Sequence, residues 1–172
     1  MFPPNQTFPT RISCDDRFAD LIKAARVTFE QSPLLGGQDR LETLFQLERI
    51  SGARIVDVAL VALVKPFSSS VNDMRALELL AERGLEPLSP HAFLALLGQH
   101  PDAGRGAVGL TLPQAFHLNG YAAVARFMIH DGGKRSLGFH PVRAPGFNVG
   151  FGEYELFAAE PVEPRPKAPE EG

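Results

Sequence analysis

The stretch Ile55-Val-Asp-Val-Ala-Leu-Val-Ala-Leu-Val64 decides the fold class of this 172-residue chain. All of its residues except Asp57 are apolar, and successive side chains of a strand point to opposite faces. Because apolar side chains fall on both faces, the sequence predicts a central strand that is covered on both sides. The following Lys65-Pro66 ends the strand, since proline has no N–H group to give to a sheet.

Two helices are predicted after this strand, over residues 71–83 and 90–97. Apolar residues recur in both at the spacing of a helix that packs on one side. The boundaries rest on capping residues and terminal glycines: Ser70 and Asp73 as a capping box, Gly84, Ser89 with Pro90, and Gly98. Start signals, stop signals and periodicity agree in both helices, so this unit anchors the prediction.

The expected fold class is α+β. It is a mostly antiparallel sheet with a central apolar strand followed by a helical hairpin, closed by a C-terminal β meander. The remaining helix is expected over residues 16–26, with Asp15 or Asp16 as its cap. The remaining strands are expected near residues 8–13, 26–30, 108–112, 121–130, 134–140 and 153–160.

Three further local predictions concern the connections between these elements. Residues 38–50 fit either a helix or a strand, and the hairpin-like Ser51-Gly52 that follows favours a strand. Pro113 is expected to end the strand that begins at residue 108. Gly132-Gly133 predicts a two-residue hairpin turn between the strands on either side of it.

Length and composition predict one domain over residues 9–160, with an extended arm over 1–8 and a disordered tail rich in Pro and Glu over 161–172. The longest apolar run has about ten residues, too few to span a membrane, so no membrane partner is expected. The single Cys14 and the absence of a signal-like start favour a cytoplasmic location.

The chain resembles a group of small bacterial proteins of uncharacterised function. The resemblance covers residues 10–160 and is sharpest in Glu82-Arg-Gly-Leu-Glu-Pro87, Ala92-Phe-Leu-Ala-Leu-Leu97 and Gln99-His-Pro-Asp102. These proteins are common in metagenomic and candidate-phylum sequences. Members often carry tryptophan in the last strands, whereas this chain has none. The resemblance supports the domain layout and implies no activity.

His100 and Asp102 are the first candidate for chemistry. An imidazole two residues from a carboxylate can act as a general base with an orienting partner. The simpler interpretation is that His100-Pro101-Asp102 only leads the chain out of the preceding helix. The second interpretation is favoured.

Three histidines on neighbouring strands are the candidates for a metal site: His117, His130 and His140. With a two-residue turn, His130 and His140 fall on opposite faces of the hairpin. A three-residue loop would bring them to the same face. The two-residue turn is favoured, so no metal site and no cofactor are predicted.

A basic block covers residues 103–150, with five Lys and Arg against one acidic residue, although the whole chain carries a net charge of −3. Its candidate anion-binding or nucleic-acid-binding residues are Arg126, Lys134, Arg135 and Arg143. Such residues also occur on solvated sheet edges, where they prevent aggregation.

The sequence thus favours a non-catalytic module that binds another protein or a second copy of itself, because each motif has a sufficient structural explanation. The first alternative is a binder of single-stranded nucleic acid or another polyanion through the basic block. The second is a small hydrolase or transferase built around His100 and Asp102.

Overall fold

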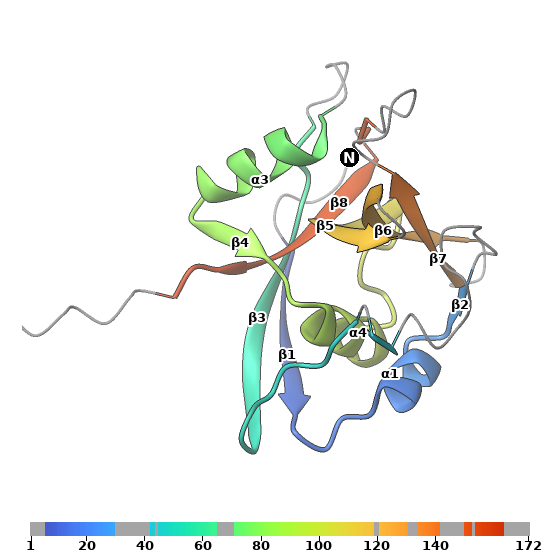
Figure 1. Cartoon of the computed structure of the whole chain (residues 1–172). Coiled ribbons are helices and arrows are strands. Elements are labelled where there is room, and N and C mark those ends of the chain that lie inside the picture. The colour runs from blue at the N-terminus through green and yellow to red at the C-terminus, as the bar shows by residue number, and fades with distance from the viewer. Residues whose placement is uncertain are drawn as a thin grey trace, which may run out of the picture.

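A computed structural model describes residues 6–29, 42–43, 45–64, 71–118, 121–130, 134–141, 150–152 and 154–163 (Figure 1). The elements are, in chain order, β1 (Gln6–Ser13), α1 (Phe18–Ala24), β2 (Val27–Phe29), β3 (Ala53–Val61), α3 (Asp73–Ala81), β4 (Leu85–Pro87), α4 (Pro90–Gln99), β5 (Gly109–Leu118), β6 (Tyr121–Ile129), β7 (Arg135–Pro141) and β8 (Glu155–Pro161). β1 starts inside the predicted arm, and the predicted tail from residue 164 onward lies outside the described residues.

The described strands form one mixed sheet in the order β1-β3-β8-β5-β6-β7-β2, and β4 pairs with the end of β8. The sheet curls into a half-barrel (Figure 1). β5 with β8 and β2 with β7 are parallel, and the other pairs are antiparallel. The expected fold class, a mostly antiparallel α+β sheet with a helical hairpin, is wrong, because the structure is a curled mixed half-barrel whose helices form no hairpin.

Two long-range pairings explain the difference. β4 lies between α3 and α4 and pairs with β8, so the two helices do not form a hairpin. β5, β6 and β7 do form a meander, but β8 leaves it and inserts between β3 and β5. A crossover of this kind makes β8 parallel to β5.

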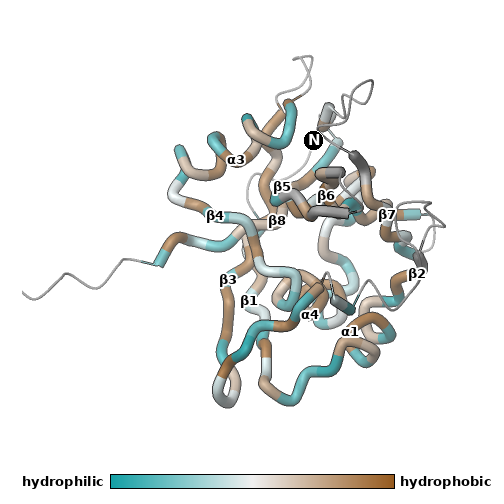
Figure 2. Tube along the Cα trace, viewed as in Figure 1, coloured by the Kyte–Doolittle hydropathy of each residue, from teal (hydrophilic) through white to brown (hydrophobic). Residues whose placement is uncertain are grey.

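Helix α4 lies inside the curl of the sheet. Seven consecutive residues, His91 to Leu97, are buried, so this helix has no solvent-facing side over that length. Ala92 to Leu97 belong to one core cluster with residues of β1, β3, β5, β6 and β7. Figure 2 shows that hydrophobic residues run along β3 and through α4.

Helix α3 covers the other face of the sheet. Its Ala76 and Leu80 pack in a second buried cluster with Val61 and Phe157. The alternate residues of β3, such as Val58, belong to the first cluster. The prediction of an apolar strand that is covered on both faces is confirmed. Among the described residues, none of the helices has the length and hydrophobicity that crossing a lipid bilayer would require.

The helix ends match the sequence signals only in part. Ser89 caps α4 by accepting the Ala92 N–H, with Pro90 at the first position, as predicted. The N-cap of α3 is Asn72, which accepts the Arg75 N–H, and not Ser70, which lies outside the described residues. Neither predicted aspartate caps α1, whose N-cap Arg17 makes no side-chain cap bond.

The predicted end of α4 at Gly98 is wrong by one residue, because the helix continues to Gln99. A Cβ atom at position 98 would lie 3.0 Å from the Cβ of Ala24. The glycine therefore permits the close approach of α4 to α1 and does not end the helix.

The strand predicted over residues 38–50 and the predicted strand end at Pro113 are also wrong. Residues 42–43 are helical and 46–50 have no regular structure, so the strand expected over 38–50 is absent from its described part. β5 continues past Pro113 to Leu118, with a register shift between Leu112 and Ala115. A bulge at this point accommodates a residue that has no N–H group for the ladder.

Gly104 offers a test of this packing. Its φ is +76°, and an added Cβ would lie 2.5 Å from Cδ2 of the buried Leu110. Gly104→Ala should lower the free energy of unfolding by roughly 2–3 kcal/mol, since it adds a clash to the conformational cost. Gly52 has φ +72° and nothing within 4 Å, so Gly52→Ala should cost only about 1 kcal/mol. Equal losses in urea unfolding would contradict the packing described.

Candidate functional site

The predicted pair His100 and Asp102 does not form a dyad. His100 follows the end of α4, and its Nε2 lies 2.9 Å from the carbonyl oxygen of Pro9, with the ring tilted against Phe8. The Asp102 carboxylate instead lies 3.2 Å from Nη2 of Arg105 at an exposed position. Each side chain has its own structural partner.

His100 belongs to a set of side chains that close the outer edge of β1. The Gln99 amide accepts the Arg11 N–H and donates to the Arg11 carbonyl, as a neighbouring strand would. The Ser13 N–H donates to Asp16 at 2.7 Å. Because these backbone groups are occupied, the edge is a poor template for pairing with another chain.

The predicted turn at Gly132-Gly133 is wrong. Ile129 pairs with Arg135, and the His130 N–H donates to the Lys134 carbonyl, so three residues separate the paired positions 130 and 134. This register puts the backbone of His140 opposite Val124, six residues along the hairpin from His130, and the His140 side chain lies outside the described part.

Those six residues correspond to about 20 Å of strand, too far for His130 and His140 to share one metal ion. The His130 Nε2 lies 2.7 Å from the Ser136 hydroxyl instead. The backbone of His117 pairs with Ala122, and its side chain lies outside the described part. Among the described residues, no three potential ligands group around a metal position.

The four basic candidates do not form one surface. Arg126 is paired with the buried Glu155 at 2.6 Å, and Glu155 also accepts the Thr111 hydroxyl. Lys134 is exposed, and Arg143 lies outside the described residues.

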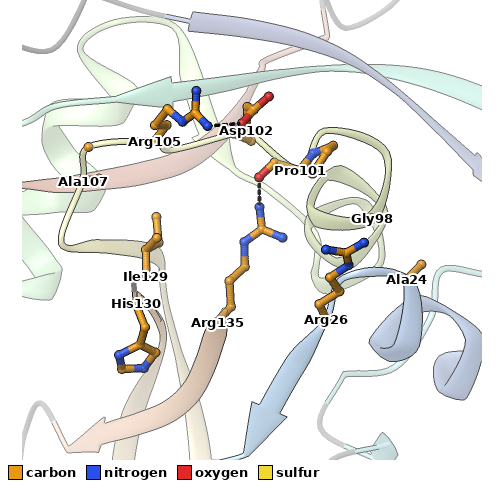
Figure 3. A pocket seen from close by; sticks show the side chains of 12 residues that line it. Ala24, Arg26, Gly98, Pro101, Asp102, Arg105, Ala107, Ile129, His130 and Arg135 are labelled. Carbon is orange, nitrogen blue, oxygen red and sulfur yellow. Dashed lines mark hydrogen bonds and ion pairs between the residues drawn. The ribbon is translucent and has the colours of Figure 1, made fainter. Parts of the chain in front are cut away.

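Arg135, a candidate anion-binding residue from the sequence, is buried. Only 3% of it is exposed. Its Nη1 donates to the carbonyl oxygens of Ala25 and Leu97, and its Nη2 donates to that of Pro101 at 2.7 Å (Figure 3). Ala25 is the C-cap of α1, and Leu97 lies in the last turn of α4. Arg135 therefore supplies donors and positive charge to the carbonyl ends of two helices.

A cavity of about 720 Å³ opens beside Arg135, between the ends of α1 and α4, the turn after α4 and the β6–β7 hairpin. Its charged and titratable lining residues are Arg26, Asp102, Arg105, His130 and Arg135 (Figure 3). With neutral histidine, three arginines and one aspartate give this lining a net charge of +2.

Burial lowers the pKa of Arg135 from its ordinary value, and the positive charge of Arg26 lowers it further, with Asp102 opposing both. The Arg135 Nε is buried and has no hydrogen-bond partner among the described residues. No described carboxylate lies within ion-pair distance of Arg135. Burying a guanidinium that contacts carbonyl dipoles but no anion lowers the free energy of unfolding. An anionic ligand would offset this loss of stability.

Arg26 and Arg105 were not singled out from the sequence. Arg26 follows the end of α1 with φ +52°, where glycine is the usual residue. An arginine directly after the last apolar position of a helix, where glycine is usual, is thus a weak sequence signal that could have marked Arg26 as a candidate site residue. Arg105 carries no comparable signal, since only the turn after α4 brings it to the cavity.

A histidine paired with an aspartate, which resembles a catalytic arrangement, lies elsewhere in the core. Asp16 contacts Nε2 of His91 at 2.7 Å, and Nδ1 of His91 accepts the N–H of Glu48. The second bond fixes the proton on Nε2 in the neutral ring. His91 is 1% exposed and, unlike Arg135, lines neither of the two cavities described in this section, so the pair is structural.

Comparison of the chain with models of known families, with curated proteins and with solved structures finds no match in any of the three. The chemistry of the site must therefore be argued from its own residues.

The Arg135 contacts predict a large effect on stability. Arg135→Met should lower the free energy of unfolding by about 3 kcal/mol, because three carbonyls at helix ends lose their donor. Lys134→Met, at the exposed neighbouring position, should change it by less than about 0.5 kcal/mol. Similar values for the two variants in urea unfolding would show that Arg135 is not a helix-end donor.

A smaller cavity of about 360 Å³ has the opposite charge and predicts a pH effect. It is lined by Arg54, Glu86, Glu160 and Glu163. Burial raises the pKa of Glu160, and the neighbouring glutamates add to this shift against Arg54. Because the pKa of Glu160 is higher in the folded than in the unfolded state, protonation of this residue favours folding. Its contribution to the free energy of unfolding is fully present below the unfolded-state pKa of 4.5 and is lost as the pH rises through the folded-state pKa.

Glu160→Gln should therefore raise the melting temperature at pH 7 and leave it nearly unchanged at pH 4. Glu78→Gln, at an exposed site on α3, serves as the control and should have little effect at either pH. A melting temperature that falls at pH 7 in Glu160→Gln would show that the pair with Arg54 outweighs burial.

Proposed function

We propose that this protein is a non-catalytic binding module whose ligand is a small anion held in the cavity lined by Arg26, Arg105 and Arg135. The observation that carries the proposal is the buried, ionically unpaired Arg135 beside two further arginines. Guanidinium groups are the preferred donors for carboxylates and phosphates, because their N–H groups match two oxygens at once. The only carboxylate in the described lining, Asp102, is already engaged by Arg105.

A small ligand is favoured over a nucleic-acid strand. Binding a strand requires a continuous row of free cations, usually with exposed aromatic side chains between them. Two of the four predicted cations are used inside the protein, since Arg126 pairs with Glu155 and Arg135 holds the helix ends. A cavity encloses a small anion better than an extended polymer.

A protein partner, the leading expectation from the sequence, has less support. The β1 edge is occupied by Gln99 and Asp16 and so offers little for strand addition. We place the module in the cytoplasm, where an exposed unpaired thiol such as Cys14 is normal.

Calorimetric titration with inorganic phosphate at low salt tests the proposal. The protein should bind phosphate, and the affinity should fall as sodium chloride is raised from about 20 to 200 mM, since salt screens the arginines. Arg105→Gln should weaken binding at least fivefold, because it removes a cavity cation and frees Asp102 to repel the anion.

Arg11→Gln is the matched control, since Arg11 is an exposed arginine of β1 and does not line the cavity. It should leave the affinity unchanged. Absence of binding at low salt, or equal losses in both variants, would contradict the proposal.

A further inference from the structure

We infer that the ligand is a phosphate monoester of a small hydroxylated compound, and that its phosphate lies between Arg26 and Arg135. This inference rests on the proposed function and adds to it the subsite and the class of ligand. Three features of the described residues support it, namely the backbone of Arg26, the unbalanced charge beside it, and the shape and lining of the cavity.

The backbone of Arg26 is the first feature. Its φ of +52° is the only positive φ of a non-glycine residue among the described residues. Residues with a Cβ atom disfavour this conformation, which glycine adopts freely, and here it directly follows Ala25, the C-cap of α1. Retaining an arginine at such a position costs stability, and residues held at that cost often serve binding sites.

The charge around Arg26 is the second feature. The guanidinium groups of Arg26 and Arg135 extend into the same cavity (Figure 3). The positive charge of Arg26 acts on Arg135, and no described carboxylate pairs with either residue. Two like charges beside each other therefore add a second cost, which Asp102 opposes without pairing with either arginine. An anion between them would turn the repulsion into two attractive contacts.

The lining of the cavity indicates the class of ligand. The net charge of +2 matches a phosphate monoester, which carries about −1.5 to −2 at pH 7, better than a single carboxylate. The volume of about 720 Å³ falls in the range of organic ligands and exceeds the needs of an inorganic ion. Ala103, Ala107 and Ile129 supply an apolar wall, and Asp102 supplies an acceptor for a hydroxyl group.

Arg26→Gly separates binding from folding. Glycine fits the φ of +52° better than arginine does, so the melting temperature should stay the same or rise slightly. Binding of ribose 5-phosphate should nevertheless weaken at least tenfold. Arg26→Lys keeps the charge without the two-oxygen fork and should give an intermediate loss. Asp102→Asn should reduce the preference for ribose 5-phosphate over inorganic phosphate, while inorganic phosphate binds at least as well as before.

Calorimetry with ribose 5-phosphate, inorganic phosphate, acetate and ribose separates the outcomes. The inference predicts that ribose 5-phosphate binds at least tenfold more tightly than inorganic phosphate, that acetate binds more weakly still, and that ribose does not bind measurably. If inorganic phosphate binds but ribose 5-phosphate binds no better, the ligand class is wrong and the anion site stands. If both bind equally well to Arg26→Gly, the subsite is wrong. If no anion binds, the proposed function fails as well.

Discussion

Burial of α4 is the constraint on which the rest of this structure depends. A helix whose residues 91 to 97 are all buried must be enclosed on every side, and a flat sheet can cover only one side. The curl of the sheet provides that enclosure together with α1, which approaches α4 closely enough for Gly98 to face Ala24. Helix α3 then covers the outer face of the same sheet.

Enclosing a helix also buries its carbonyl end, where the last carbonyl groups have no partner within the helix. Arg135 meets this need by donating to Leu97 of α4, to Pro101 in the turn that follows, and to Ala25, the C-cap of α1. A positive charge is favourable at these helix ends, so a cation in the interior has a structural reason. The proposed binding site follows from this arrangement, because the guanidinium that holds the two helix ends also lines the cavity.

Local signals in the sequence predicted most helices and strands. The features that they missed are those that depend on contacts between residues far apart in the sequence. The central strand and the Ser89-Pro90 start of α4 were readable because each depends on nearby residues. The insertion of β8 between β3 and β5 depends on residues about 50 to 100 positions apart, which no local pattern records. β4 is only three residues long and ends in proline, so its strand signal was too weak to separate α3 from α4.

The candidate site was predictable only in part, for the same reason. Arg135 was identified as basic and anion-binding, but a charged residue beside a hairpin turn is normally exposed. Its burial is explained by the carbonyl groups at the ends of α1 and α4, which need hydrogen-bond donors and lie far from Arg135 in the sequence. The neighbours Arg26 and Arg105 come from α1 and the turn after α4, and tertiary structure alone brings them to one cavity. The register of the β6–β7 hairpin was also wrong in the prediction, because one residue of loop length shifts every paired position.

The most direct test of this account is a crystal structure of the protein soaked with tungstate, a heavy analogue of phosphate whose tungsten gives a strong anomalous signal. The account predicts the strongest anomalous peak between the guanidinium groups of Arg26 and Arg135, in the cavity at the ends of α1 and α4. Peaks confined to exposed arginines and lysines elsewhere, with this cavity empty, would contradict it.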